Sequence, residues 1–115
     1  MNTLRIQTRQ VDDVDILDLT GRIILGEAST RLRESLKPYA QQPNARVLLN
    51  FSEVQYIDSS GLGELVSAFA AIRRQGGELK LLRLTRKVHD LLQITKLYTV
   101  FDIHDDEAEA IAAFA

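Results

Sequence analysis

Two adjacent serines at a predicted strand–helix junction are the residues of this chain best placed for chemistry. Asp58, Ser59 and Ser60 follow an apolar run at residues 46–51. After them come apolar residues at helical spacing, namely Leu62, Leu65, Val66, Phe69 and Ile72. All three polar side chains are therefore candidate helix caps. The junction also suits a phosphate, because free backbone N–H groups and the helix dipole are positive there. Such a phosphate could belong to a ligand or be attached to a serine.

Two glycines in the first turn of this predicted helix point to a contact surface. Gly61 and Gly63 each cost about 1 kcal/mol relative to alanine inside a helix. That cost suggests that another molecule approaches the backbone closely, so we expect both glycines to be contact surface. Ser60 is expected to be the structural cap. Glu64 is one residue too far from Ser60 for a capping box, so we expect it in solvent or against a partner's basic residue.

The elements that position these residues follow from hydrophobic periodicity. Residues 4–8 and 14–19 alternate as half-buried strands, and the Asp12-Asp13 turn between them predicts a hairpin. Residues 46–51 are almost continuously apolar, as expected of a central strand covered on both faces. Residues 78–84 and 100–103 predict two further strands.

Helical patterns separate these strands. One helix begins at about Glu27 and should end or kink at Pro38, and the helix after the two serines should stop at Gly76-Gly77. Thr85 is expected to cap a short third helix. A terminal helix should bury Ala108, Ile111 and Ala112. Alternating strands and helices predict parallel crossover units, and the hairpin makes the sheet mixed.

Composition excludes several classes of function. The 115 residues carry a net charge of −2, and no stretch gathers basic residues without acids among them, so we expect no nucleic-acid partner. The chain has no cysteine, which excludes disulfides and thiol chemistry. The first residues lack the apolar core of a signal peptide, and no apolar run reaches membrane-spanning length. We therefore expect a cytoplasmic protein without membrane insertion.

No catalytic set can be assembled from the motifs. His89 and His104 are isolated and are expected at the surface. There is no glycine-rich phosphate loop, no pair of catalytic carboxylates and no Ser/His/Asp arrangement. The sequence therefore favours a module without catalytic residues, metal or cofactor, on which an enzyme acts.

The stretch from Asp58 to Gly63, with its strand before and its glycine-terminated helix after, resembles the signature of STAS domains. The bacterial anti-sigma factor antagonists are the group it is most similar to. The similarity runs from residues 17–21 to Leu91-Leu92 and Phe101. It implies one domain over residues 1–115 with an α/β, STAS-like fold. Such a fold has a mixed central sheet of about four to five strands and about four helices.

The resemblance also implies a switch. Ser59 corresponds to the serine that a partner kinase phosphorylates, and Asp58 belongs to the same phosphorylation site. Unphosphorylated, the protein would bind a serine-kinase anti-sigma factor and free the sigma factor. A serine phosphatase would act on the phosphorylated form and return it to the unphosphorylated one. The implied partner-binding residues are Asp58, Ser59, Ser60, Gly61, Leu62, Gly63 and Glu64.

The chain departs from the family in two places. Arg22 stands where many members carry an acid, and residues 22–27 contain no aspartate. Lys96 stands where glycine is common, and a positive φ there would cost about 1 kcal/mol or more. Two alternatives stay open. One is a STAS accessory subunit of a transporter or signalling scaffold, with Ser59 only a cap. The other is a small nucleotide-binding or nucleotide-hydrolysing protein that uses the helix start as a phosphate cradle.

Overall fold

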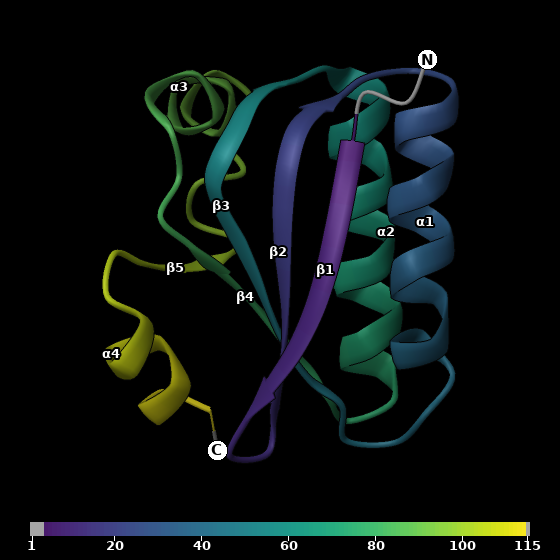
Figure 1. Cartoon of the computed structure of the whole chain (residues 1–115), viewed down its shortest axis with the longest axis vertical. Helices are drawn as coiled ribbons and strands as arrows, with labels where there is room; N and C mark the ends of the chain where they lie inside the picture. Colours follow the sequence, from purple (N-terminus) through teal and green to yellow (C-terminus); the bar gives the residue numbers. More distant parts are fainter. Residues whose placement is uncertain (1–3, 115) are drawn as a thin grey trace.

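One five-stranded mixed sheet organises the molecule. The computed structural model describes residues 4–114, and its strands lie in the order β1-β2-β3-β4-β5 (Figure 1). Only β1 and β2 are antiparallel, and their turn confirms the predicted hairpin. β3 is the central strand, as predicted. The strands are β1 (Leu4–Val11), β2 (Val14–Ile23), β3 (Arg46–Ile57), β4 (Glu78–Leu82) and β5 (Asp102–His104).

Helices pack on the two faces unequally. The described helices are α1 (Glu27–Ala40), α2 (Ser59–Arg74), α3 (Arg86–Ile94) and α4 (Glu107–Ala112). The main core includes residues of α1, α2 and α3 packed against Leu17 and Leu49. A smaller core places Ala110 of α4 against Ile16 and Leu48. Since adjacent residues of a strand point to opposite faces, α4 covers the face that the other three helices leave open. β3 is therefore covered on both faces only along its first half, because Ser52 and Glu53 are exposed.

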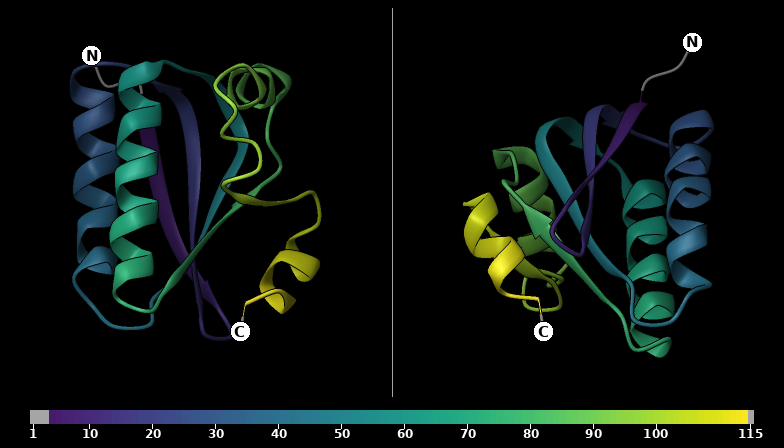
Figure 2. Two further views of the ribbon diagram at one scale, coloured as in Figure 1. Left: turned by 180° about the vertical axis from the view of Figure 1, so that it is seen from behind. Right: turned by 60° about the horizontal axis from the view of Figure 1, so that its bottom comes forward.

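Helices α1 and α2 lie side by side and begin at the same end of the sheet (Figure 2). Each follows a strand of the parallel β2–β3 pair, so each starts where its strand ends. The carboxyl ends of β2 and β3 therefore meet the first turns of both helices, and this end of the molecule holds Ser59.

Several local expectations need correction. α1 continues two residues past Pro38, because a proline in the last turn removes only one hydrogen bond near the helix end. Thr85 precedes α3 but does not cap it, because its hydroxyl donates to the carbonyl of Val54 at 2.8 Å. In α4 the buried residue is Ala110, whereas Ala108 and Ala112 are exposed. Lys96 adopts a φ of 62°, so this turn keeps the backbone shape that usually favours glycine.

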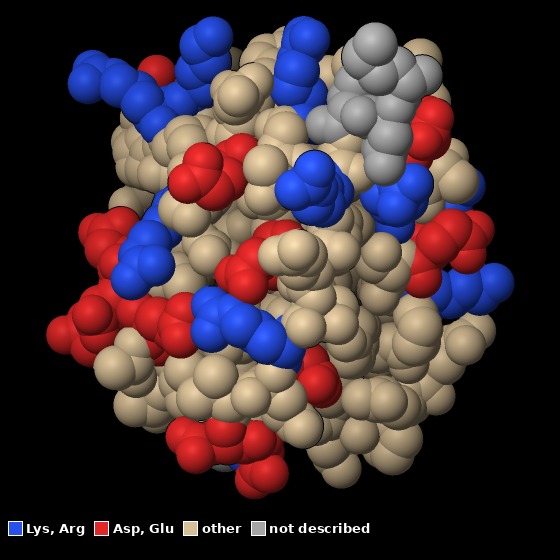
Figure 3. Space-filling model, viewed as in Figure 1, with Lys and Arg blue, Asp and Glu red and all other residues tan. Residues whose placement is uncertain are grey.

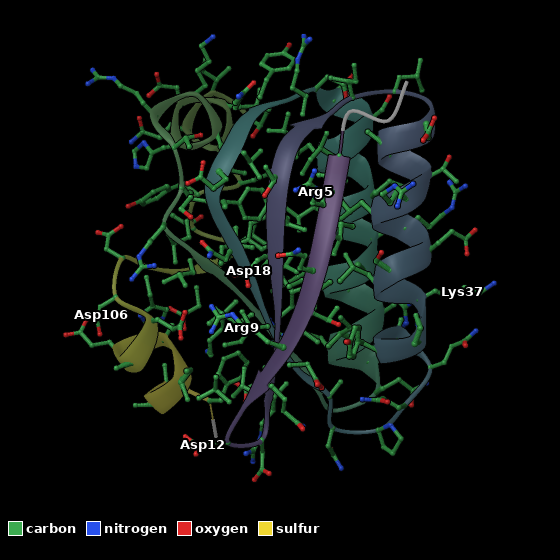
Figure 4. All side chains as sticks on the ribbon, viewed as in Figure 1. Arg5, Arg9, Asp12, Asp18, Lys37 and Asp106 are labelled. Atoms are coloured by element: carbon green, nitrogen blue, oxygen red, sulfur yellow. The ribbon has the colours of Figure 1, made fainter. Side chains whose placement is uncertain are left out.

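Arg9 attaches α4 to the sheet. Its Nε donates to Asp18 at 2.7 Å on β2, and its Nη1 donates to Glu107 at 3.0 Å on α4. Asp18 also accepts from the side-chain amide of Asn50 at 2.8 Å. Figure 4 shows Arg9 and Asp18 on the face of the sheet that carries α4. Both charge signs are scattered over this face, with acids gathered over α4 (Figure 3).

Candidate functional site

Asp58 caps helix α2, and the two serines after it are left free. The backbone of Asp58 is extended, and its Oδ1 accepts from the N–H of Gly61 at 2.9 Å. The expectation that Ser60 caps the helix is wrong, because Ser59 and Ser60 already lie in the first helical turn. Neither serine hydroxyl has a hydrogen-bond partner among the described residues. Ser59 is exposed and Ser60 is half-buried.

The same carboxylate also holds the loop between β2 and α1. Oδ2 of Asp58 accepts from the N–H of Leu25 at 2.9 Å, and the N–H of Asp58 donates to the carbonyl of Ile23 at 3.2 Å. Partial burial by itself raises the pKa of Asp58, but the backbone hydrogen bonds from Gly61 and Leu25 outweigh it and lower the pKa below its ordinary value. Asp58 is therefore ionised at neutral pH, with both oxygens occupied by backbone donors.

Gly61 serves packing inside the chain, so the expectation that it is contact surface is wrong. It is buried, and a Cβ added there would lie 2.5 Å from the carbonyl oxygen of Ile23 and 2.9 Å from Cγ1 of Ile57. Leu62 is also buried, at 6% exposure. Gly63 differs, because it is exposed and nothing lies within 4 Å of an added Cβ. Of the two glycines, only Gly63 is accessible to a partner.

Glu64 has a partner within the chain, contrary to expectation. Its Oε2 accepts from Nη1 of Arg33 at 2.9 Å, which links α2 to α1. The periodicity of either helix could not show this pair, because the two residues are 31 positions apart.

A hollow of about 440 Å³ lies between the starts of the two helices. Its lining includes Leu25, Thr30 and Arg33 on one side and Ser59, Gly63 and Glu64 on the other. Leu25 is 75% exposed, although it is a large apolar residue. Sequence reasoning missed both Leu25 and Arg33. The only available signal for Leu25 was its position in the loop of residues 22–27, which departs from the family pattern.

Other polar residues that the sequence singled out contact neighbours within the chain. Arg22 lies beside Tyr56 across the β2–β3 pair, with its guanidinium carbon 6.0 Å from the ring centroid. His89 and His104 are half-buried, and Nε2 of His104 lies 2.9 Å from Oδ2 of Asp102. Within residues 4–114, no three His, Asp or Glu side chains gather closely enough to hold a metal ion. None of the helices in that part of the chain is long and apolar enough to cross a membrane.

Fold and site together define a small α/β domain whose free serine hydroxyl follows its central strand. A model of the STAS domain family matches residues 5–110, and the chain belongs to this family. It is 34% identical over 100 residues to the anti-sigma-B factor antagonist of Bacillus subtilis, covering 87% of this chain and 90% of that protein. It is 32% identical over 107 residues to the protein of the same name from Listeria monocytogenes, covering 93% and 92%.

A solved structure supports the architecture. The chain matches the Bacillus anti-sigma factor antagonist SpoIIAA in its unphosphorylated form with a TM-score of 0.75. The match covers 93% of each chain at 22% identity, so it bears on the fold alone. The expected mixed sheet with four helices is thereby confirmed.

Proposed function

We propose that this chain is an anti-sigma factor antagonist that binds a serine-kinase anti-sigma factor through the end of the molecule that carries Ser59. Phosphorylation of Ser59 by that kinase ends the binding, and a serine phosphatase restores it. The observation that carries the proposal is the exposed, unpaired hydroxyl of Ser59, which is available because Asp58 caps the helix. The names of the Bacillus and Listeria relatives support the same function.

In this proposal the chain is the substrate and the kinase supplies the catalysis. The Ser59 oxygen forms a bond to the γ-phosphorus of the kinase-bound ATP, ADP leaves, and the hydroxyl proton passes to a base of the kinase. The new group adds roughly −1.5 to −2 charges at neutral pH. At the start of α2 the helix dipole favours this charge, so the fold tolerates it. The partner surface, which is complementary to a neutral hydroxyl, does not.

The contact surface that we propose differs from the seven residues of the motif. Ser59 and Gly63 are exposed and contact the partner directly, with Asp58, Ser60 and Glu64 at the half-buried rim. Gly61 and Leu62 act from inside by shaping the turn. Leu25 joins the surface, because it projects beside Ser59 from a loop that Asp58 holds. An exposed apolar side chain that binding would bury is typical of an interface anchor.

The test is phosphate mapping by mass spectrometry after incubation with ATP and the kinase-type anti-sigma factor of the same organism. We expect one phosphate on Ser59 in the unsubstituted chain and in Ser60→Ala, and none in Ser59→Ala. Without the kinase, ATP should leave the chain unmodified. Ser59→Asp should bind the partner at least about tenfold more weakly, which corresponds to about 1.4 kcal/mol. The mimic is partial, because aspartate carries one charge.

Ser60→Ala is the matched control for this test. Because Asp58 is the cap, we expect Ser60→Ala to change the free energy of unfolding by less than about 0.5 kcal/mol. Phosphate on Ser60 with Ser59 unmodified would place the switch one residue further on. A kinase that binds but transfers phosphate to neither serine would favour the scaffold-subunit alternative.

A further inference from the structure

Arg33 and Ser59 line the same hollow from two different helices. Nη1 of Arg33 donates to Glu64 at 2.9 Å, and Glu64 lines the hollow with them. The Arg33 side chain is 53% exposed and that of Glu64 is 22% exposed. A salt bridge this exposed is weakly held, because water and salt screen it. The arginine can therefore change partners at little cost.

The geometry of the two helices leads Arg33 toward Ser59. Long side chains on a helix lean toward its N-terminus, and α1 and α2 begin at the same end of the molecule (Figure 2). Gly63 lies one turn after Ser59 on the same side of α2, and nothing is within 4 Å of the place where its Cβ would be. Gly63 lines the hollow with Ser59 and Arg33, and as a glycine it adds no side chain to that hollow.

We propose that Arg33 is the residue that receives the phosphate of Ser59. On phosphorylation its guanidinium leaves Glu64 and pairs with the phosphate. A phosphate dianion carries about twice the charge of a carboxylate and offers three oxygens to the planar guanidinium fork. The exchange rests on the proposed function only in taking Ser59 as the modified residue.

The exchange of partners by Arg33 changes the charge at two places on the contact surface instead of one. Before phosphorylation, Arg33 neutralises Glu64, and Ser59 is neutral. Afterwards the cation has moved to the phosphate, and Glu64 is left as an unpaired carboxylate on the same rim. A partner docked here therefore meets two changes of charge distribution, one at each side of the hollow.

The experiment installs phosphoserine at position 59 during synthesis, so that no kinase is needed, and follows the phosphate by ³¹P NMR from about pH 4 to 8. A nearby cation favours the dianion and lowers its pKa. We expect the second pKa of the phosphate to lie below its usual value of about 6 and to rise by at least about 0.3 in Arg33→Gln. In Glu64→Gln it should fall further, because a like charge and a competitor for Arg33 are both lost. Asp58 is the other acid beside the phosphate and is kept in every variant.

Arg31→Gln is the matched control. Arg31 lies on the same helix and pairs with Glu27 at 3.7 Å, but it does not line the hollow. We expect Arg31→Gln to leave the phosphate titration unchanged. The Nε–H resonance of Arg33 should also shift on phosphorylation. Equal titrations in Arg33→Gln and Arg31→Gln would overturn the proposal. Because the phosphate is installed synthetically, that result would leave the kinase test of the proposed function intact, and failure of the kinase test would leave this one intact.

Discussion

Two single residues, Asp58 and Gly61, determine where Ser59 lies and leave its hydroxyl without a hydrogen-bond partner among the described residues. Asp58 uses one oxygen for the helix and the other for the loop at Leu25, so the serines keep their hydroxyls. Gly61 lets the Ile23 carbonyl approach the first turn of α2. These two contacts join segments that are more than 30 residues apart in the sequence. The position of Ser59 is thus set by packing around its neighbours.

The two glycines give a matched pair of substitutions. We expect Gly61→Ala to lower the free energy of unfolding by about 1–3 kcal/mol, because the new Cβ would clash with backbone that cannot move cheaply. Gly63→Ala should raise it by up to about 1 kcal/mol, because alanine is the better helix former and the space there is open. Urea denaturation measures both changes. A Gly61→Ala protein as stable as the parent would show that the Ile23 loop yields easily.

At the scale of elements, α4 depends on a small number of contacts. It is six residues long, Asp106 caps it, and Ala110 is its only buried residue. Arg9 of β1 ties it to β2 through Asp18 and Glu107. The hydrogen bond from Arg9 lowers the pKa of both carboxylates, more than burial raises it. Both acids therefore stabilise the folded state in their ionised form.

The sign of this effect predicts loosening of α4 in acid. A carboxylate with a depressed pKa contributes its stability above its unfolded pKa of about 4 and loses it as the pH falls through the lower folded value. We expect amide exchange in α4 to accelerate below about pH 4 while exchange in β3 stays slow. Because the groups are partly exposed, the contribution should be only about 0.5–1 kcal/mol.

Arg9→Gln tests at neutral pH whether the ion pairs of Arg9 hold α4 on the sheet. It should accelerate amide exchange in α4 and flatten the acid dependence of stability. Arg5→Gln is the control, because Arg5 lies on the same strand and face but has no ion pair among the described residues (Figure 4). If Arg5→Gln loosened α4 as much as Arg9→Gln, the ion pairs of Arg9 would not be what holds α4 on the sheet.

At the scale of the whole molecule, the proposed switch occupies one end. The carboxyl ends of β2 and β3 and the first turns of α1 and α2 converge there, which is where open α/β sheets commonly place their sites. The hollow at Ser59 and the exposed Leu25 share that end. A partner can therefore cover the serine, the hollow and an apolar anchor together.

Leu25→Ala tests whether this end acts as one surface. We expect at least about tenfold weaker binding to the kinase-type anti-sigma factor, measured by calorimetry, because an apolar anchor is lost. The free energy of unfolding should change by less than about 0.5 kcal/mol, since the side chain is 75% exposed. Ile94→Ala is the control, because Ile94 is similarly exposed, at 79%, but lies on α3 outside the hollow. Equal binding by the parent and Leu25→Ala would remove Leu25 from the interface.

The sequence by itself determined the elements, the central strand and the stretch that carries the site. Period-2 and helical spacings are local, so they located the hairpin, β3 and the start of α2 at Ser59 within a few residues. The six residues from Asp58 to Gly63 resembled the STAS signature, and the family match agrees. The ends of the elements were predicted less exactly. The strand predicted over residues 78–84 stops at Leu82, and the strand predicted from residue 100 begins at Asp102.

Only the tertiary structure decided how the site residues are used. Asp58 rather than Ser60 caps α2, because the Leu25 loop and the helix start both donate to its carboxylate. Thr85 donates to Val54 instead of capping α3, and Glu64 pairs with Arg33 instead of facing solvent. Each outcome depends on a partner about 30 residues away in the sequence. No local sequence pattern contains that partner, because the two side chains meet only when the helices and loops pack onto the sheet.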